Sequence, residues 1–248
     1  MCLIVFAWRP THRQPLIVAA NRDEFYARPT QPMTEWHDAP GVYAGRDLEA
    51  GGTWLGIGNH GRFAALTNIR DPNHPPGRRS RGELVARFLT GEQPIEDYLA
   101  EVVACAGEYG GFNLLLGTAD SLFFLSAVSA QPQLLKAGVY GLSNAGLDTP
   151  WPKLLKAKAA LLAELDDPQV SALLGLLRDP DIAPEAGLPD TGVGRVTESL
   201  LSSVFISSPN YGTRASSALI VNADGSRHFA EHSFGPYGGH LGVVELIV

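Results

Sequence analysis

With 248 residues, of which 45% are hydrophobic and 18% are charged, the chain can bury a substantial core, which excludes disordered and fibrous classes and predicts a single domain over residues 1–248. Its formal net charge of −7 argues against general nucleic-acid binding, which normally needs an excess of Lys and Arg. No segment reaches the roughly 18 apolar residues that cross a membrane, so we expect no membrane span. No signal peptide is recognisable, and two cysteines are too few for a disulfide framework. We therefore expect a cytoplasmic protein.

Pairs of short apolar segments joined by turn sequences predict antiparallel hairpins. The first pair joins residues 2–8 to residues 16–20 through a turn that is bounded by prolines. The further predicted strands are 53–57 with 62–68, 112–117 with 122–128, 216–221 with 227–231, and a closing strand at 242–248. The order is not that of strand–helix–strand units, and Gly56-Ile57-Gly58 is too weak a glycine pattern to indicate a dinucleotide-binding fold.

Helices are predicted in two blocks between these hairpins. Ser80 and Glu83 form a capping box that opens a helix through about Leu89, and residues 94–106 continue this block. The second block comprises residues 151–165, 168–177 and 197–204, and its leucines recur at helical spacing, as core residues do: Leu154, Leu155, Leu161, Leu162 and Leu165. Hairpins with segregated helices predict an α+β fold in which helices cover antiparallel sheets.

Cys2 is the first candidate for chemistry because removal of Met1 would make it the N-terminal residue. A free α-amino group titrates at roughly 7.7 to 8.0 and can take the proton from the adjacent thiol, so one residue would supply both nucleophile and base. The alternative is a small apolar residue that opens a buried strand. Cys105, in an apolar helical segment, is interpreted as a core residue.

Four consecutive polar residues, Asn21 to Glu24, come directly after the second predicted strand. Alone, such a run is usually a solvated loop, but strand pairing brings it close to Cys2. Asp23 is placed to accept a hydrogen bond from an α-ammonium group, and the charge of Arg22 is placed to stabilise a thiolate, so both would ease ionisation of the sulfur. For Glu24 we expect only a structural pairing with a neighbouring arginine.

Short motifs extend the pattern over nearly the whole chain. In order they are the Met-Cys start, Asn-Arg-Asp-Glu at 21–24, Gly-Gly-Thr-Trp-Leu-Gly at 51–56, Ala-Leu-Thr-Asn at 65–68, Ser-Arg-Gly at 80–82 and Tyr-Gly-Thr-Arg at 211–214. Together they resemble the NRDE protein family, also called the transport and Golgi organisation 2 family. That family looks like a branch of the N-terminal-nucleophile hydrolases, closest to cysteine-dependent penicillin V acylases, bile-salt hydrolases and acyl-coenzyme A acyltransferases. The resemblance implies a four-layer αββα sandwich of two antiparallel sheets flanked by helices.

The resemblance also implies a catalytic set, which comprises Cys2, Arg22, Asp23, Asn68, Asn144 and Arg214. Cys2 would attack a small amide or an acyl thioester, and Asn68 and Asn144 would donate hydrogen bonds to the developing oxyanion. The three charged residues would set charge and orientation. This hydrolase or acyltransferase reaction needs no cofactor. The alternative is a non-catalytic carrier of haem or acyl-coenzyme A in the same cleft, because the family is associated with haem handling and acyl-lipid metabolism.

Three other features of the sequence lie outside this catalytic set. His228 and His232 match an inverted zinc motif that needs a helix, but they lie in a predicted strand, where residues four apart are separated by roughly 13 Å, so no metal site is expected. The cluster Arg78, Arg79 and Arg81 precedes a helix and would bind a phosphate or a propionate, or lie solvated; we favour the solvated loop. The proline-rich segment 72–77 is predicted to be a mobile lid.

Overall fold

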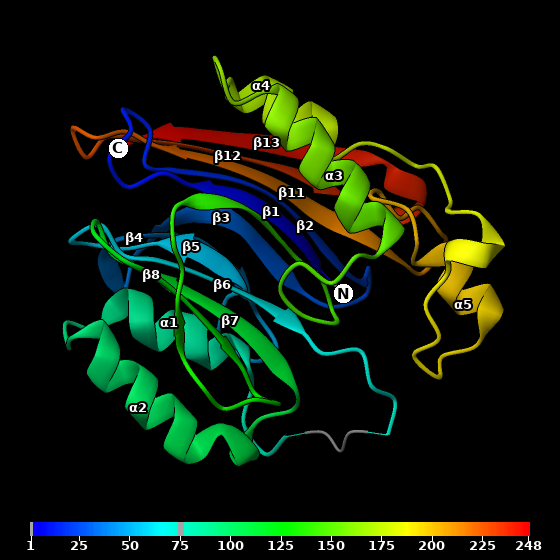
Figure 1. Cartoon of the computed structure of the whole chain (residues 1–248), viewed down its shortest axis with the longest axis horizontal. Coiled ribbons are helices and arrows are strands. Elements are labelled where there is room, and N and C mark those ends of the chain that lie inside the picture. Colours follow the sequence, from blue (N-terminus) through cyan, green and yellow to red (C-terminus); the bar gives the residue numbers. More distant parts are fainter. Residues whose placement is uncertain (1, 74–76) are drawn as a thin grey trace. The chain divides into compact units, whose positions relative to one another are not determined.

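The computed structural model describes residues 2–73 and 77–248 and contains two antiparallel sheets that carry helices (Figure 1). The predicted α+β fold class is therefore confirmed. The chain separates into two compact units. The first unit contains the residues up to 27, residues 70–72 and residues 137–248, and the second contains residues 28–69 and 73–136. The single domain over residues 1–248 stays a prediction.

The described part of the first unit forms a six-stranded sheet with the order β10-β1-β2-β11-β12-β13. Its strands are β1 (Cys2–Trp8), β2 (Leu16–Phe25), β10 (Gly138–Leu142), β11 (Tyr211–Val221), β12 (Arg227–Phe234) and β13 (His240–Ile247). The opening hairpin is confirmed, with Trp8 opposite Leu16 at the turn and Cys2 opposite Arg22 at the far end. The hairpin β11–β12 and the closing strand are confirmed as well.

Helices cover one face of this sheet (Figure 1). They are α3 (Pro152–Ala163) and α4 (Val170–Leu176), and the unit also contains α5 (Arg195–Leu200) and the 3-10 turns Glu185–Gly187 and Pro236–Gly238. Leu3 and Val5 of β1 share a buried core with Leu154 and Leu161 of α3. The core assignment is wrong for two residues, since Leu155 is 52% exposed and Leu162 is 53% exposed. These two leucines lie on the outer side of the helix, next in sequence to buried ones.

The first turn of α3 packs closely on β10, and this contact predicts a cost for a methyl group at Gly141. A Cβ atom there would lie 2.6 Å from the side chain of Leu154, which is itself buried. We expect Gly141→Ala to lower the free energy of unfolding by about 1–3 kcal/mol, because the core must move to accept the group. Urea denaturation measures this change. Gly175→Ala in α4 is the matched control, since nothing lies within 4 Å of its Cβ position and alanine favours a helix. A Gly141→Ala variant with the same free energy of unfolding as the unsubstituted protein would contradict this close packing.

The described part of the second unit forms a seven-stranded sheet whose strands follow chain order from β3 to β9. They are β3 (Thr30–Trp36), β4 (Ala39–Asp47), β5 (Leu55–Ile57), β6 (Phe63–Asn68), β7 (Phe112–Gly117), β8 (Leu122–Ser126) and β9 (Gln133–Leu134). Helices α1 (Gly82–Thr90) and α2 (Ile95–Cys105), followed by the 3-10 turn Ala106–Glu108, pack on it through a shared apolar core. Cys105 lies half-buried against that core, in agreement with its interpretation. Both hairpins predicted in this unit are present.

The predicted capping box at α1 is absent. The N-cap residue is Arg81 rather than Ser80, it has helical backbone angles, and it makes no side-chain capping bond. The Glu83 carboxylate instead forms an ion pair with Arg79. The arginine offers the carboxylate a charged hydrogen-bond partner, which is stronger than a backbone N–H group.

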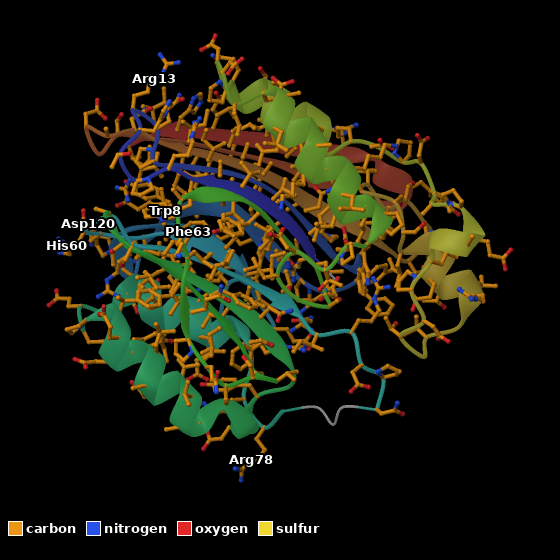
Figure 2. The ribbon with its side chains drawn as sticks, viewed as in Figure 1. Trp8, Arg13, His60, Phe63, Arg78 and Asp120 are labelled. Carbon is orange, nitrogen blue, oxygen red and sulfur yellow. The ribbon has the colours of Figure 1, made fainter. Side chains whose placement is uncertain are left out.

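The arginine cluster before α1 is only partly solvated. Arg78 is exposed and points away from the ribbon (Figure 2), as predicted. Arg79 lies over the ring of Tyr109 and also binds Glu108 at 3.0 Å, while Arg81 donates to the carbonyl oxygen of Gly111 at 3.2 Å. The interpretation as a solvated loop is therefore wrong for Arg79 and Arg81. Both residues link the start of α1 to the segment 108–111.

Residues 74–76 of the predicted lid lie outside the described residues, so the lid stays a prediction. Across residues 2–73 and 77–248, no helix combines the length and hydropathy needed to cross a membrane.

Candidate active site

Five of the six predicted site residues lie in the first unit, on or beside its central strands. Cys2 and Arg22 are direct partners in the β1–β2 pairing, so their side chains project from the same face of the sheet. Asp23 follows Arg22 in β2, and Asn144 lies just after β10. Arg214 belongs to β11, which pairs with β2. Asn68 is the last residue of β6 in the second unit, where it pairs with Phe112, and its catalytic role stays a prediction.

The polar tetrad lies inside β2 and not after it, which corrects the prediction. Strand β11 continues pairing along β2 as far as Phe25 opposite Tyr211, so the backbone stays in the sheet beyond Ala20. The buried Asn21 side chain has its hydrogen bonds satisfied within the fold. Asn21 donates from Nδ2 to the carbonyl oxygens of Leu177 at 3.0 Å and Val204 at 2.8 Å, and its Oδ1 accepts from Ser216 at 2.6 Å. Asn21 is thus a structural residue that binds the segments beside the sheet.

The surroundings of Cys2 raise the pKa of its thiol. Burial is the main cause, and the negative charge of Asp23 acts in the same direction. The charge of Arg22 and a hydrogen bond from the Asp23 backbone lower the pKa but do not outweigh burial. The charge of Arg22 thus acts in the expected direction and the Asp23 carboxylate in the opposite one. That the two residues together ease ionisation of the sulfur stays a prediction, and a thiol in this position needs a base close to it.

The Asp23 carboxylate is almost completely buried, with 1% of the residue exposed. The hydroxyl of Thr213 donates to its Oδ1 at 2.8 Å, and the hydroxyl of Tyr211 donates to its backbone oxygen at 3.2 Å. Burial raises the pKa of Asp23, and the positive charge of Lys153 is the largest of the influences that lower it. Lys153 belongs to α3 and did not emerge from the sequence.

Asn144 contacts Cys2 directly. It is fully buried, and the backbone nitrogen of Cys2 donates to its Oδ1 at 3.3 Å. The backbone oxygen of Asn144 accepts from the backbone nitrogen of Arg70 at 2.8 Å. The Arg70 guanidinium in turn forms a buried ion pair with Glu198 at 2.6 Å and lies over the ring of Trp151. Arg70 therefore fixes the Asn144 turn in place.

Glu198 and Arg70 belong to no local sequence pattern that would have predicted their place beside the site. The Glu198 carboxylate accepts from the backbone nitrogen of Thr191 at 2.9 Å and from its hydroxyl at 2.5 Å. For Lys153 a signal existed, because it shares a helical stripe with Leu154, Ala157 and Leu161, all of which are buried. A charged residue on an apolar helix face has to find a polar environment in the core.

Arg214 and Glu24 interact mainly with the backbone. Arg214 occupies a bulge in β11 and donates to the carbonyl oxygens of Tyr26 at 2.7 Å and Phe25 at 3.2 Å. Burial and the charge of Arg22 lower its pKa. The Glu24 carboxylate accepts from the backbone nitrogen of Phe25 at 2.9 Å, and in the part of the chain that the structure describes it forms no ion pair with an arginine, contrary to expectation.

The two histidines of the zinc-like motif lie on β12, so the helix that the motif requires is not there. The Nε2 of His228 pairs with Glu245 of β13 at 2.6 Å, and His232 lies against the ring of Phe234. In residues 2–73 and 77–248, no group of three His, Cys, Asp or Glu side chains is arranged to hold a metal ion.

Comparison with known proteins relates this geometry to a family and to a solved fold. The model of the family described as Transport and Golgi organisation 2 matches residues 1–236. The Transport and Golgi organization protein 2 homologs of Homo sapiens and Bos taurus are each 38% identical, over 94% of this chain and 93% of their own length. The C2A mutant of conjugated bile acid hydrolase from Clostridium perfringens superimposes with a TM-score of 0.53 and 8% identity, over 99% of this chain and 92% of that chain.

Proposed function

Since the chain belongs to the Transport and Golgi organisation 2 family and has an N-terminal-nucleophile hydrolase fold, we propose that it is a cysteine-dependent amidohydrolase or acyltransferase. Its substrate class is a small amide or an acyl thioester, and Cys2 is the nucleophile once Met1 has been removed. The observation that carries the proposal is that the Cys2 nitrogen bonds Asn144 while Arg22 faces Cys2 across the hairpin. The structural neighbour was solved as a mutant at its own residue 2, a cysteine.

The proposed reaction uses the α-amine of Cys2 as the base. The amine takes the thiol proton, the sulfur bonds to the carbonyl carbon, and the carbonyl oxygen becomes negative. Asn144 supports the amine through Oδ1, and its Nδ2 amide is the proposed oxyanion donor. Collapse breaks the bond to the leaving amine or thiol, which takes the proton from the α-ammonium. Water, or an acyl acceptor, then attacks the acyl-cysteine with the amine again as base.

The electrostatics of the site support a role for this amine. Burial raises the pKa of the Cys2 thiol, so thiolate formation needs a proton acceptor beside the sulfur. A free α-amino group of ordinary pKa, roughly 7.7 to 8.0, is such an acceptor near neutral pH. Arg22, opposite Cys2, would then hold the thiolate by charge.

Intact-protein mass spectrometry with a limiting thiol alkylator tests the proposal. We expect the purified chain to lack Met1 and to be alkylated at Cys2 faster than at Cys105, despite the stronger burial of Cys2. Cys105 is the internal control, because its thiol packs half-buried at the end of α2 and donates to the Val102 oxygen. Retained Met1, or a Cys2 that reacts no faster than Cys105, would contradict the proposal. Saturable binding of haem or acyl-coenzyme A without product would then favour the carrier function.

A further inference from the structure

Lys153 is a buried lysine at the start of a helix, where a positive charge is least favourable. Only 3% of the residue is exposed, and it directly follows Pro152 in the first turn of α3. Among residues 2–73 and 77–248, its Nζ has no hydrogen-bond partner. Both the burial of an ammonium group and its position at a helix N-terminus destabilise the charged form. A compensating negative charge is therefore needed nearby.

The chain topology brings this helix start to the Cys2 end of the sheet. Strand β10 runs antiparallel to β1 and ends with Leu142 opposite Ile4. The chain then turns through Asn144, which bonds Cys2, and enters α3. The residue after Lys153, Leu154, packs directly on Gly141 of β10. Lys153 thus stands over the end of the sheet at which Cys2 lies.

Strand alternation places Asp23 on the side of the sheet that α3 covers. Ile17 and Ala19 of β2 belong to the apolar core shared with α3 and α4. Because successive side chains of a strand point to opposite faces, Asn21 and Asp23 point to that same side, whereas Arg22 points away from it with Cys2. Asp23 and Lys153 therefore lie on the same side of the sheet, the side that α3 covers.

The charges around the two groups agree with this placement. Lys153 is the strongest charge acting on Asp23, and Asp23 is the strongest charge acting on Lys153. Burial lowers the pKa of Lys153 to about 8 although Asp23 raises it. The other buried charges nearby, Arg70 and Glu198, form their own ion pair at 2.6 Å. On the side of β11, Thr213 and Tyr211 contribute only neutral hydroxyls to Asp23.

We propose that Lys153 is a positioning residue of the Cys2 site, whose ammonium keeps the Asp23 carboxylate charged so that it can orient the α-amine at Cys2. The inference rests on the proposed function, because the amine exists only after loss of Met1. Asp23 alone is too deeply buried to keep its charge easily, and the Lys153 ammonium alone would be costly to bury in the first turn of a helix. Each group compensates for the burial of the other.

Carbon-13 NMR of protein labelled at the aspartate γ-carbons tests the proposal. The Asp23 resonance is assigned by its loss in Asp23→Asn, and its chemical shift reports the charge directly. We expect a carboxylate at neutral pH in the unsubstituted protein. In Lys153→Met, which keeps the side-chain length without the charge, the titration midpoint of Asp23 should rise by at least about one pH unit, a tenfold change in its proton affinity. In Lys153→Arg, which keeps a positive charge, the Asp23 midpoint should return most of the way to its value in the unsubstituted protein.

Lys156→Met is the matched control on the same helix, because Lys156 is exposed and pairs with Asp179 and Asp181 outside the site; its Asp23 titration should be unchanged. An Asp23 midpoint that is the same in Lys153→Met and the unsubstituted protein would overturn the proposal. If Lys153→Met does not fold, the unsubstituted protein decides, since an Asp23 that is protonated at neutral pH also overturns it. The NMR titration of Asp23 can be measured whether or not Met1 is removed and whether or not the protein turns over a substrate. Failure of the proposed function is therefore seen separately, by mass spectrometry.

Discussion

Replacement of Cys2 by alanine is expected to reduce the hydrolysis or transfer rate by at least about 10³-fold, because it removes the only atom proposed to bond to the substrate. Cys2→Ser should keep a weak nucleophile and lose a large part of the rate as well. A screen of acyl amides and acyl thioesters with the processed protein provides the rate. The effect is predicted for the chemical step, so substrate that is bound should remain bound in Cys2→Ala.

The fold should survive this substitution. Cys2 is buried in β1, and loss of its sulfur removes little apolar volume, so the free energy of unfolding should fall by no more than about 1–2 kcal/mol. Cys105→Ala is the control, since it removes the other thiol without touching the site and should leave the rate unchanged. Turnover that persists in Cys2→Ala at the unsubstituted rate would reject Cys2 as nucleophile.

Most of the fold was predictable where local signals are strong. The hairpins that were predicted have apolar strands joined by Gly, Asn, Asp or Pro turns, which are the physical requirements of antiparallel pairing. The pair β3 and β4 lacks the apolar pattern, although Asp38 lies in the turn between the strands. Strand β3 has Pro32 and mostly polar side chains, and its pairing with β4 is interrupted by two register shifts. A proline and irregular pairing are tolerated there because β3 is an edge strand of its sheet.

The candidate site was predictable only in the part that is close together in the sequence or carried by motifs. The Cys2–Arg22 pairing follows from the opening hairpin, and the buried Asp23 follows one residue later. The ion pair of Arg70 and Glu198 joins residues 128 apart, and neither belongs to a recognisable local pattern. Arg70 lies in the segment between β6 and α1, and Glu198 lies in the short helix α5, so only the folded chain shows that they meet. Because the backbone of Arg70 bonds that of Asn144, this ion pair helps to hold Asn144 in place beside Cys2.

Replacement of Glu198 by glutamine is expected to destabilise the protein by about 3–5 kcal/mol, because it removes the carboxylate that neutralises a buried guanidinium. The Arg70 side chain is 4% exposed and that of Glu198 is 1% exposed, so water cannot substitute for the lost charge. Glutamine retains an oxygen acceptor for Thr191, which isolates the charge from the hydrogen bonds that Glu198 also accepts. Urea denaturation followed by circular dichroism measures the loss.

The double variant Arg70→Met with Glu198→Gln separates the ion pair from the packing around it. Since no buried charge of the pair is left, it should be more stable than Glu198→Gln alone, as a double-mutant cycle of coupled residues requires. Lys156→Met, which breaks an exposed pair whose Asp181 side chain is 77% exposed, should change stability by no more than about 1 kcal/mol. Equal losses of stability for the exposed and the buried pair would contradict this account.

The same Glu198→Gln variant should slow alkylation of Cys2. The backbone of Arg70 holds the turn that contains Asn144, and the Oδ1 of Asn144 accepts a hydrogen bond from the Cys2 nitrogen.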